Sequence, residues 1–167
     1  KKYDLKLFYE GADKDFRPVG GAASYEPDHS SAEWKNYFTY GEKVPNIFGS
    51  GDVKRAGYTF DGWYCGNVKL WNSDGSPVKG AKVNGSYWSD SNGNYVWTSS
   101  QATTVHAHWT PNHYNLTIYY NNSDTRPTGL ATEIADDKSW ARWDGFFTYD
   151  KSISNVFDSE NMKRTGY

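Results

Sequence analysis

The chain has 167 residues, a formal net charge of −2 and a mean hydropathy of −0.88. Eighteen Lys and Arg against 20 Asp and Glu leave no basic surplus for phosphates or anionic lipid, so we expect no nucleic-acid partner. Apolar stretches stay well short of the roughly 18 residues of a membrane span, and the N-terminal residues lack the apolar core of a signal peptide. We therefore expect a soluble fragment or mature piece without membrane insertion.

Aromatic residues are unusually frequent, at 18% of the chain, with 8 Trp, 14 Tyr and 8 Phe. Large rings must then supply much of the buried area, because each buries roughly 150–250 Å². Trp, Tyr, Phe and Thr suit a pleated sheet, and 16 Gly with many Asn, Asp and Ser supply turns. The composition favours a β-rich domain of extracellular type.

The first 65 residues predict three strands joined by long connections. Alternating apolar and polar residues indicate a strand over residues 3–9. Residues 10–33 contain Gly, Pro and scattered charges, which is typical of a long loop or a short irregular helix. A second strand is expected over 34–40, and 42–56 could hold one short helix. Residues 57–65, with the sequence GYTFDGWYC, predict a strand with a bend or bulge at its glycines.

Residues 66–101 predict an array of β-hairpins, because Asn-Gly and Asp-Gly turn signals separate short aromatic segments. The expected short strands lie near residues 67–71, 78–83, 86–89 and 94–98. A last strand over 103–109 places its apolar residues on one face, with His106 and His108 on the other.

The chain repeats itself with a period of about 110 residues. Residues 3–9, YDLKLFY, recur as YNLTIYY at 114–120. Residues 17–58 then align with 126–167 at a constant offset of 109, and 18 of these 42 positions are identical. The chain therefore holds one and a half copies of a repeat.

Two framings of the repeat remain open from the sequence. In the first, residues 1–110 form a complete module with an insertion at about 66–101, and residues 111–167 form the N-terminal half of a second, incomplete copy. In the second, the module is permuted and runs, for example, from 59 to 167. Under the first framing we expect 111–167 to fold only with help from residues 1–110 or a neighbouring chain.

The run KRAGYTFDGWY at 54–64, followed by TVHAHWTPN at 104–112, resembles the internalin-type B-repeat, also called the Listeria-Bacteroides repeat. The resemblance implies a β-rich α+β fold, a β-grasp (ubiquitin- or SUMO-like) repeat module, here with an expanded β-hairpin insertion. It implies tandem modules on an extracellular bacterial cell-surface protein that act as stalk, spacer or adhesive contact, without catalysis. The implied partners are neighbouring repeats or another copy of the chain, and a host or microbial surface protein or glycan.

A carbohydrate-binding module is the alternative function. Aromatic rings crowd the hairpin array, and exposed ring faces on a rigid sheet can stack against sugars; alternation, however, sends about half of such rings into the core. The candidate ligand-binding residues are Trp71, Tyr87, Trp88, Tyr95 and Trp97. Trp140 is a further candidate, because its counterpart Ser31 is not aromatic.

Catalytic and metal-binding patterns are weaker. The spacing of His106 and His108, with His113 nearby, fits half of a zinc site, but no carboxylate or cysteine is placed to complete it. Asp-rich turns in the hairpins are too short for a calcium loop and are explained by turn chemistry. Cys65 is expected to be a small apolar residue, although a thioester or isopeptide crosslink stays open. We expect no enzyme, no cofactor and no metal site.

Overall fold

The computed structural model describes residues 1–83, 86–87, 96–153 and 164. The chain divides into two compact units, unit 1 at Lys1–Thr110 and unit 2 at Pro111–Tyr167. This division falls at the joint between the two sequence copies. Within the described ranges, no helix is long and apolar enough to cross a membrane.

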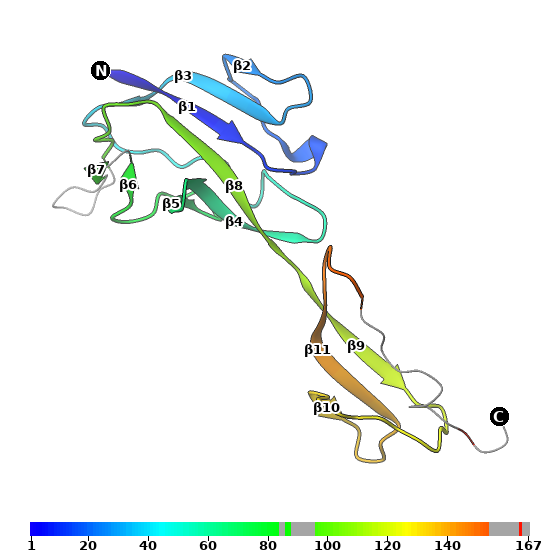
Figure 1. Cartoon of the computed structure of the whole chain (residues 1–167). Coiled ribbons are helices and arrows are strands. Elements are labelled where there is room, and N and C mark those ends of the chain that lie inside the picture. The colour runs from blue at the N-terminus through cyan, green and yellow to red at the C-terminus, as the bar shows by residue number, and fades with distance from the viewer. Residues whose placement is uncertain (84–85, 88–95, 154–163, 165–167) are drawn as a thin grey trace. The chain divides into compact units, whose positions relative to one another are not determined.

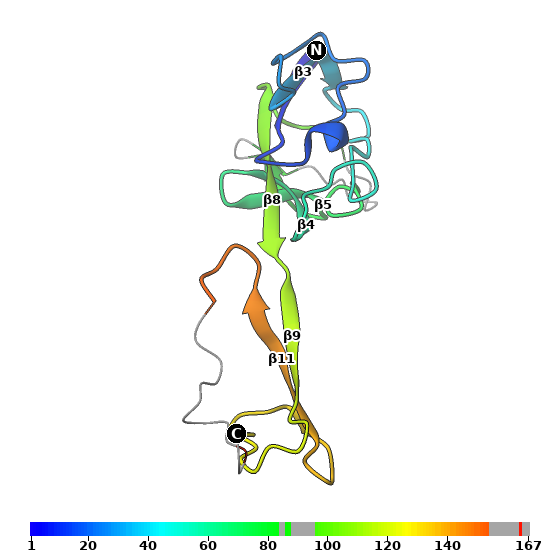
Figure 2. The ribbon, with the colours of Figure 1, turned by 90° about the vertical axis from the view of Figure 1, so that its right-hand side faces the viewer.

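Unit 1 is built on a six-stranded curled sheet with the strand order β2-β3-β1-β8-β4-β5 (Figure 1). Its strands are β1 (Lys2–Phe8), β2 (Ser24–Tyr25), β3 (Ser31–Thr39), β4 (Tyr58–Cys65), β5 (Val68–Asn72) and β8 (Thr103–Pro111). Strand β1 pairs antiparallel with β3 and parallel with β8. The first and last strands of the unit are therefore neighbours in the middle of the sheet (Figure 1), and Figure 2 shows β8 along its length in a second view.

Most strands predicted from alternation are confirmed. Residues 3–9 and 103–109 correspond to β1 and β8, and the bulge expected in residues 57–65 lies between Trp63 and Tyr64 of β4. The hairpin array forms β5 and the small pair β6 (Lys82–Val83) and β7 (Ser86–Tyr87). Near residues 94–98, the described part of the chain shows only an isolated bridge between Lys43 and Val96.

The predicted fold class was wrong. The described chain is almost all β and contains no helix of seven residues or more, so it is not an α+β β-grasp fold with an expanded hairpin insertion. Its one described helix is a short 3₁₀ turn at Lys14–Phe16, η1. The expectation of a short helix over 42–56 was also wrong.

The segment 42–56 forms no helix because its backbone groups bond elsewhere. Ile47 N–H donates to Gly75 O at 2.9 Å, and Ser50 N–H donates to Ser73 O at 2.6 Å. Pro45 also lacks the N–H that a helix needs, and its carbonyl accepts a hydrogen bond from Trp71 Nε1 at 3.0 Å. Contacts distant in the sequence therefore outweigh any local helical preference.

Rings supply much of the core of unit 1, as the composition predicts. Phe38 stacks on Trp97 with ring centroids 3.7 Å apart, and Trp71 lies 6.0 Å from Phe38 in a second stack. Trp63 meets Phe60 edge to face at 5.5 Å and donates from Nε1 to Phe48 O at 2.6 Å. Burying the Trp63 indole nitrogen with a carbonyl partner avoids the cost of an unsatisfied donor.

Unit 2 is a three-stranded sheet with the order β10-β11-β9. Its strands are β9 (His113–Tyr119), β10 (Glu133–Ile134) and β11 (Trp140–Thr148). They repeat β1, β2 and β3 of unit 1 in order and pairing. A small core of Tyr120, Ala141 and Trp143 lies beneath them.

The two copies share their tryptophan anchor. In unit 1, Trp34 Nε1 donates to Gly20 O at 3.1 Å, and in unit 2, Trp143 Nε1 donates to Gly129 O at 3.0 Å. Each bond fixes the loop before the long strand to the sheet. The repeated residues therefore make the same contact in both places.

The copies also share an arginine tether. Arg17 Nη1 donates to Asp28 O at 2.8 Å, and Arg126 Nη1 donates to Asp137 O at 2.7 Å. A guanidinium suits this position because it can donate to two carbonyls from one rigid plane, and the Nε atom of each arginine bonds to a second carbonyl. The tethers hold the otherwise irregular loops in one conformation.

Both units have a β-bulge at the same position of the repeat, but a different residue accepts its hydrogen bond. In unit 1, Asp4 Oδ1 accepts from Asn36 N–H, and in unit 2, Asn115 Oδ1 accepts from Gly145 N–H, both at 2.9 Å. Asn36 and Gly145 have positive φ values of 55° and 63°. An aspartate and an asparagine thus serve the same acceptor role, while the Asn36 N–H and the Lys35 ammonium lower the pKa of Asp4.

Tyr9 gives unit 1 a measurable dependence on alkaline pH. Its side chain is fully buried and its hydroxyl donates to Pro18 O. Burial raises the pKa of Tyr9 above its ordinary value of about 10. Since the folded state holds the proton more tightly, its contribution to stability is complete below about pH 10 and is lost as pH rises above that value.

The Tyr9→Phe variant is expected to lose about 1 kcal/mol at neutral pH, because the Pro18 carbonyl loses its donor. The difference in unfolding free energy between wild type and variant should then shrink from about pH 10 upward, since phenylalanine has no proton to lose. Urea denaturation at a series of pH values measures this difference. A difference that stays constant on the alkaline side would contradict the assignment.

Candidate functional site

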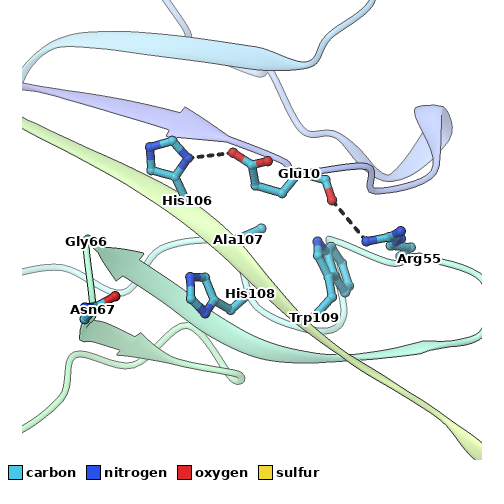
Figure 3. A pocket seen from close by; sticks show the side chains of 8 residues that line it. All are labelled: Glu10, Arg55, Gly66, Asn67, His106, Ala107, His108 and Trp109. Atoms are coloured by element: carbon cyan, nitrogen blue, oxygen red, sulfur yellow. Dashed lines mark hydrogen bonds and ion pairs between the residues drawn. The ribbon is translucent and has the colours of Figure 1, made fainter.

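The candidate site is a polar cleft along β8 in unit 1, between Glu10, just after the end of β1, and the turn that joins β4 to β5. Its cavity volume is about 580 Å³. The lining residues, drawn in Figure 3, are Glu10, Arg55, Gly66, Asn67, His106, Ala107, His108 and Trp109. Four of the eight come from consecutive positions of β8, so this strand provides one wall of the cleft.

Alternation along β8 explains which side chains enter the cleft. Val105 and Ala107 are buried in the core of unit 1, so His106 and His108 project to the opposite face. This confirms the predicted placement of both histidines. Trp109, which ends the predicted strand 103–109, is half-buried and packs against the core.

His106 is tied to the end of β1. Its Nδ1 lies 2.6 Å from Glu10 Oε1 (Figure 3), and its ring stacks on Phe8 with centroids 4.8 Å apart. Both contacts cross the β1–β8 seam. The side chains of His106 and Glu10 are 43% and 47% exposed, so water screens their polar contact and the ring stack provides part of the interaction.

Trp109 makes a further contact across the seam. Its Nε1 donates to Tyr9 O at 3.2 Å, and its ring lies 5.1 Å from Phe60. Arg55 Nη1 reaches Glu10 O at 3.4 Å, while its guanidinium lies over the Tyr58 ring at 3.8 Å. The groups near the end of β1 thus bond to residues of β8 and of the segment before β4.

His108 faces the other neighbour of β8, strand β4. Its ring stacks on Tyr64 at 3.8 Å. Tyr64 OH donates to Asp61, and Lys69 Nζ lies 2.8 Å from the same carboxylate. The hydrogen bond from Lys69, followed by that from Tyr64, lowers the pKa of Asp61. Both histidines therefore act as cross-strand packing groups.

The side chains of the cleft mainly contact residues of neighbouring strands and stabilise the sheet. Within the described ranges, no group of three or more His, Cys, Asp or Glu side chains is placed to hold a metal ion. The third histidine, His113, pairs with Thr148 Oγ1 at 3.1 Å within unit 2. Its contact is local to the β9–β11 pair.

The predicted ligand-binding rings do not form an exposed platform where the structure describes them. Trp71 and Trp97 are 0% and 1% exposed and lie in the core of unit 1, so they offer no free face to a sugar. Tyr87 belongs to β7, while Trp88 and Tyr95 lie outside the described residues. Trp140 is half-buried in β11. Glycan binding by the hairpin array stays a prediction.

Sequence reasoning missed the seam itself. The sequence signal for Phe8, Glu10 and His106 is weak, because 96 residues separate Glu10 from His106. Only the parallel pairing of β1 with β8 brings them together. The repeat does offer one sign, since both copies begin with a strand that carries an aromatic residue in the position of Phe8.

Comparisons with known proteins provide no family. No protein-family model, no curated protein and no solved structure matches this chain.

Proposed function

We propose that the chain is a non-catalytic tandem-repeat part of an extracellular bacterial surface protein, and that it serves as a spacer under tension. The observation that carries the proposal is the parallel pairing of β1 with β8, the first and last strands of unit 1. The duplicated scaffold and the likeness of residues 54–64 and 104–112 to a surface-protein repeat support the location and the tandem use.

The pairing determines how tension acts on unit 1. The two strands form a parallel ladder of four residue pairs: Leu5 with Thr103, Lys6 with Thr104, Leu7 with Val105, and Phe8 with His106. Force that pulls the two ends of the unit apart drags β1 and β8 past each other along their length. The ladder bonds between them then bear load together, and several must break in the same event.

Side chains reinforce the same seam. His106 contacts both Phe8 and Glu10, and Trp109 donates to Tyr9 O. A sliding motion of β1 against β8 would separate all of these contacts before the strands part. Forced unfolding depends on the unfolding rate, so contacts that must break first raise the resistance to force even when they add little to equilibrium stability.

The His106→Ala variant is expected to lower the force at which unit 1 unfolds. The full chain is held by attachment points at Lys1 and Thr110 and stretched in a single-molecule force experiment. The substitution removes the stack on Phe8 and the side-chain contact with Glu10, while the backbone ladder between β1 and β8 stays.

The matched control is His29→Ala. His29 contacts Tyr25 of the edge strand β2 edge to face at 4.9 Å, away from the β1–β8 seam. Its removal should leave the unfolding force unchanged. Equal losses in both variants, or no loss in His106→Ala, would contradict a load-bearing role for the seam.

A further inference from the structure

The outer edge of β9 in unit 2 differs from its counterpart in unit 1. Strand β1 has β3 on one side and β8 on the other. Strand β9 has β11 on one side, and among the residues that the structure describes no strand pairs with its other side. An open strand edge presents a row of backbone donors and acceptors that can pair with another strand.

The two strands have the same register against their shared neighbour. In unit 1, Leu5 and Leu7 pair with Trp34 and Ala32. In unit 2, the corresponding pairs are Leu116 with Trp143 and Ile118 with Ala141. Since this side matches residue for residue, the outer edge of β9 corresponds to the edge of β1 that pairs with β8.

The backbone groups that face this outer edge can be assigned. Tyr120 N–H donates to Ser139 O on the β11 side at 2.9 Å. Successive residues of a strand direct their N–H and C=O groups to opposite sides, so Ile118 also faces β11. The groups of Thr117 and Tyr119 therefore point to the outer edge.

Side-chain exposure also differs between β1, which has β8 beside it, and β9, which has no described strand on that side. Phe8 is half-buried and stacks on His106 of β8, whereas its counterpart Tyr119 is 66% exposed. A strand placed as β8 is placed in unit 1 would lie beside Tyr119 and cover part of this surface.

We propose that the outer edge of β9 binds a β8-type strand, with the sequence pattern TTVHAHW, supplied by another polypeptide in parallel orientation. Leu116 takes the place of Leu5 opposite the first threonine, and Tyr119 takes the place of Phe8 opposite the first histidine. Backbone bonds to Thr117 and Tyr119 provide affinity, and the stack of histidine on Tyr119 provides register. The proposal rests on the comparison of the two units and is independent of the role under tension.

The test uses the full chain and a synthetic peptide with the sequence of residues 102–110. Fluorescence anisotropy measures binding of the labelled peptide, and hydrogen exchange locates it. We expect saturable binding that slows exchange at the amides of Thr117 and Tyr119. A scrambled peptide should not bind.

Two variants separate the edge from its side chains. Thr117→Pro removes one outer-edge N–H, and proline is tolerated at an edge, so affinity should fall about tenfold or more. Thr117→Val retains the N–H and should bind as wild type does. If Thr117→Pro also loses exchange protection at Ile118, the substitution has disturbed the β9–β11 pair itself. A peptide with proline in place of Val105 then gives the same test with the wild-type chain.

Four outcomes would overturn the proposal. These are the absence of binding, equal affinity for the proline-containing peptide, and protection at Lys6 and Phe8 of unit 1 in place of unit 2. The fourth is protection of Thr117 and Tyr119 before any peptide is added, which would mean that the edge is already paired within the chain or with a second copy.

Discussion

Replacing Gly75 with alanine is expected to destabilise unit 1 by about 2–5 kcal/mol. Gly75 has a φ of +83°, which costs an L-residue roughly 1–2 kcal/mol. A Cβ there would also lie 2.1 Å from Ile47 O, the carbonyl oxygen of the residue whose own N–H donates to Gly75 O. Relieving that clash must shift one of the two loops and adds about 1–3 kcal/mol.

Gly41→Ala is the matched control for this prediction. Gly41 has the same φ of +83°, but a Cβ there would meet nothing within 4 Å. Its cost should therefore be limited to the roughly 1–2 kcal/mol of backbone strain. Chemical denaturation of the full chain, with exchange at the Leu7 amide to report on unit 1, measures both. Equal costs would mean that the loop at Ile47 moves freely away from Gly75.

Replacing Trp97 with alanine is expected to cost about 3–5 kcal/mol of stability. Its ring is buried against Phe38 with planes 1° apart and also lies 6.5 Å from Tyr3. Removing it leaves a cavity beneath β1 and β3. The same denaturation experiment gives the size of the loss.

Trp97→Phe separates packing from any other role of the ring. A phenyl group can stay stacked on Phe38, so we expect a clearly smaller loss than for alanine. A ring that served only as an exposed sugar platform would give no stability loss in either variant. That result would contradict the position of Trp97 in the core.

Local pattern was enough to predict the strands with clear alternation. Residues 3–9 and 103–109 each show one apolar and one polar face, and β1 and β8 formed there with the predicted faces. The bulge near Gly62 also followed from local chemistry, because its φ of +140° and a backbone oxygen 2.3 Å from any added Cβ leave room only for glycine.

Contacts between distant segments could not be predicted in this way. Segment 42–56 has the length of a short helix, but its amides bond to residues 73–75. Alternation left open whether Trp71 and Trp97 face solvent, and the rings of Phe38 and Tyr3 cover them. The candidate seam depends on the same kind of pairing, because nothing local indicates that β8 enters the sheet beside β1.

The duplicated sequence correctly indicated that the two units share a scaffold. Equivalent residues bond equivalent carbonyls in both units, as Trp34 and Trp143 do. The copies differ where β8 has no described counterpart, beside β9. Both the role under tension and the strand-binding edge follow from this one strand, which is central in unit 1.

The most direct test of the role under tension compares two pulling directions in the same unit. Attachment at Lys1 and Thr110 loads the β1–β8 seam along its length. Attachment at Lys1 and Tyr40 instead opens the antiparallel β1–β3 pair from one end, where Tyr40 N–H bonds Lys1 O at 2.9 Å, so its bonds break one after another. We predict a markedly higher unfolding force for the first direction. An equal or lower force in that direction would contradict the proposal that unit 1 bears tension through this seam.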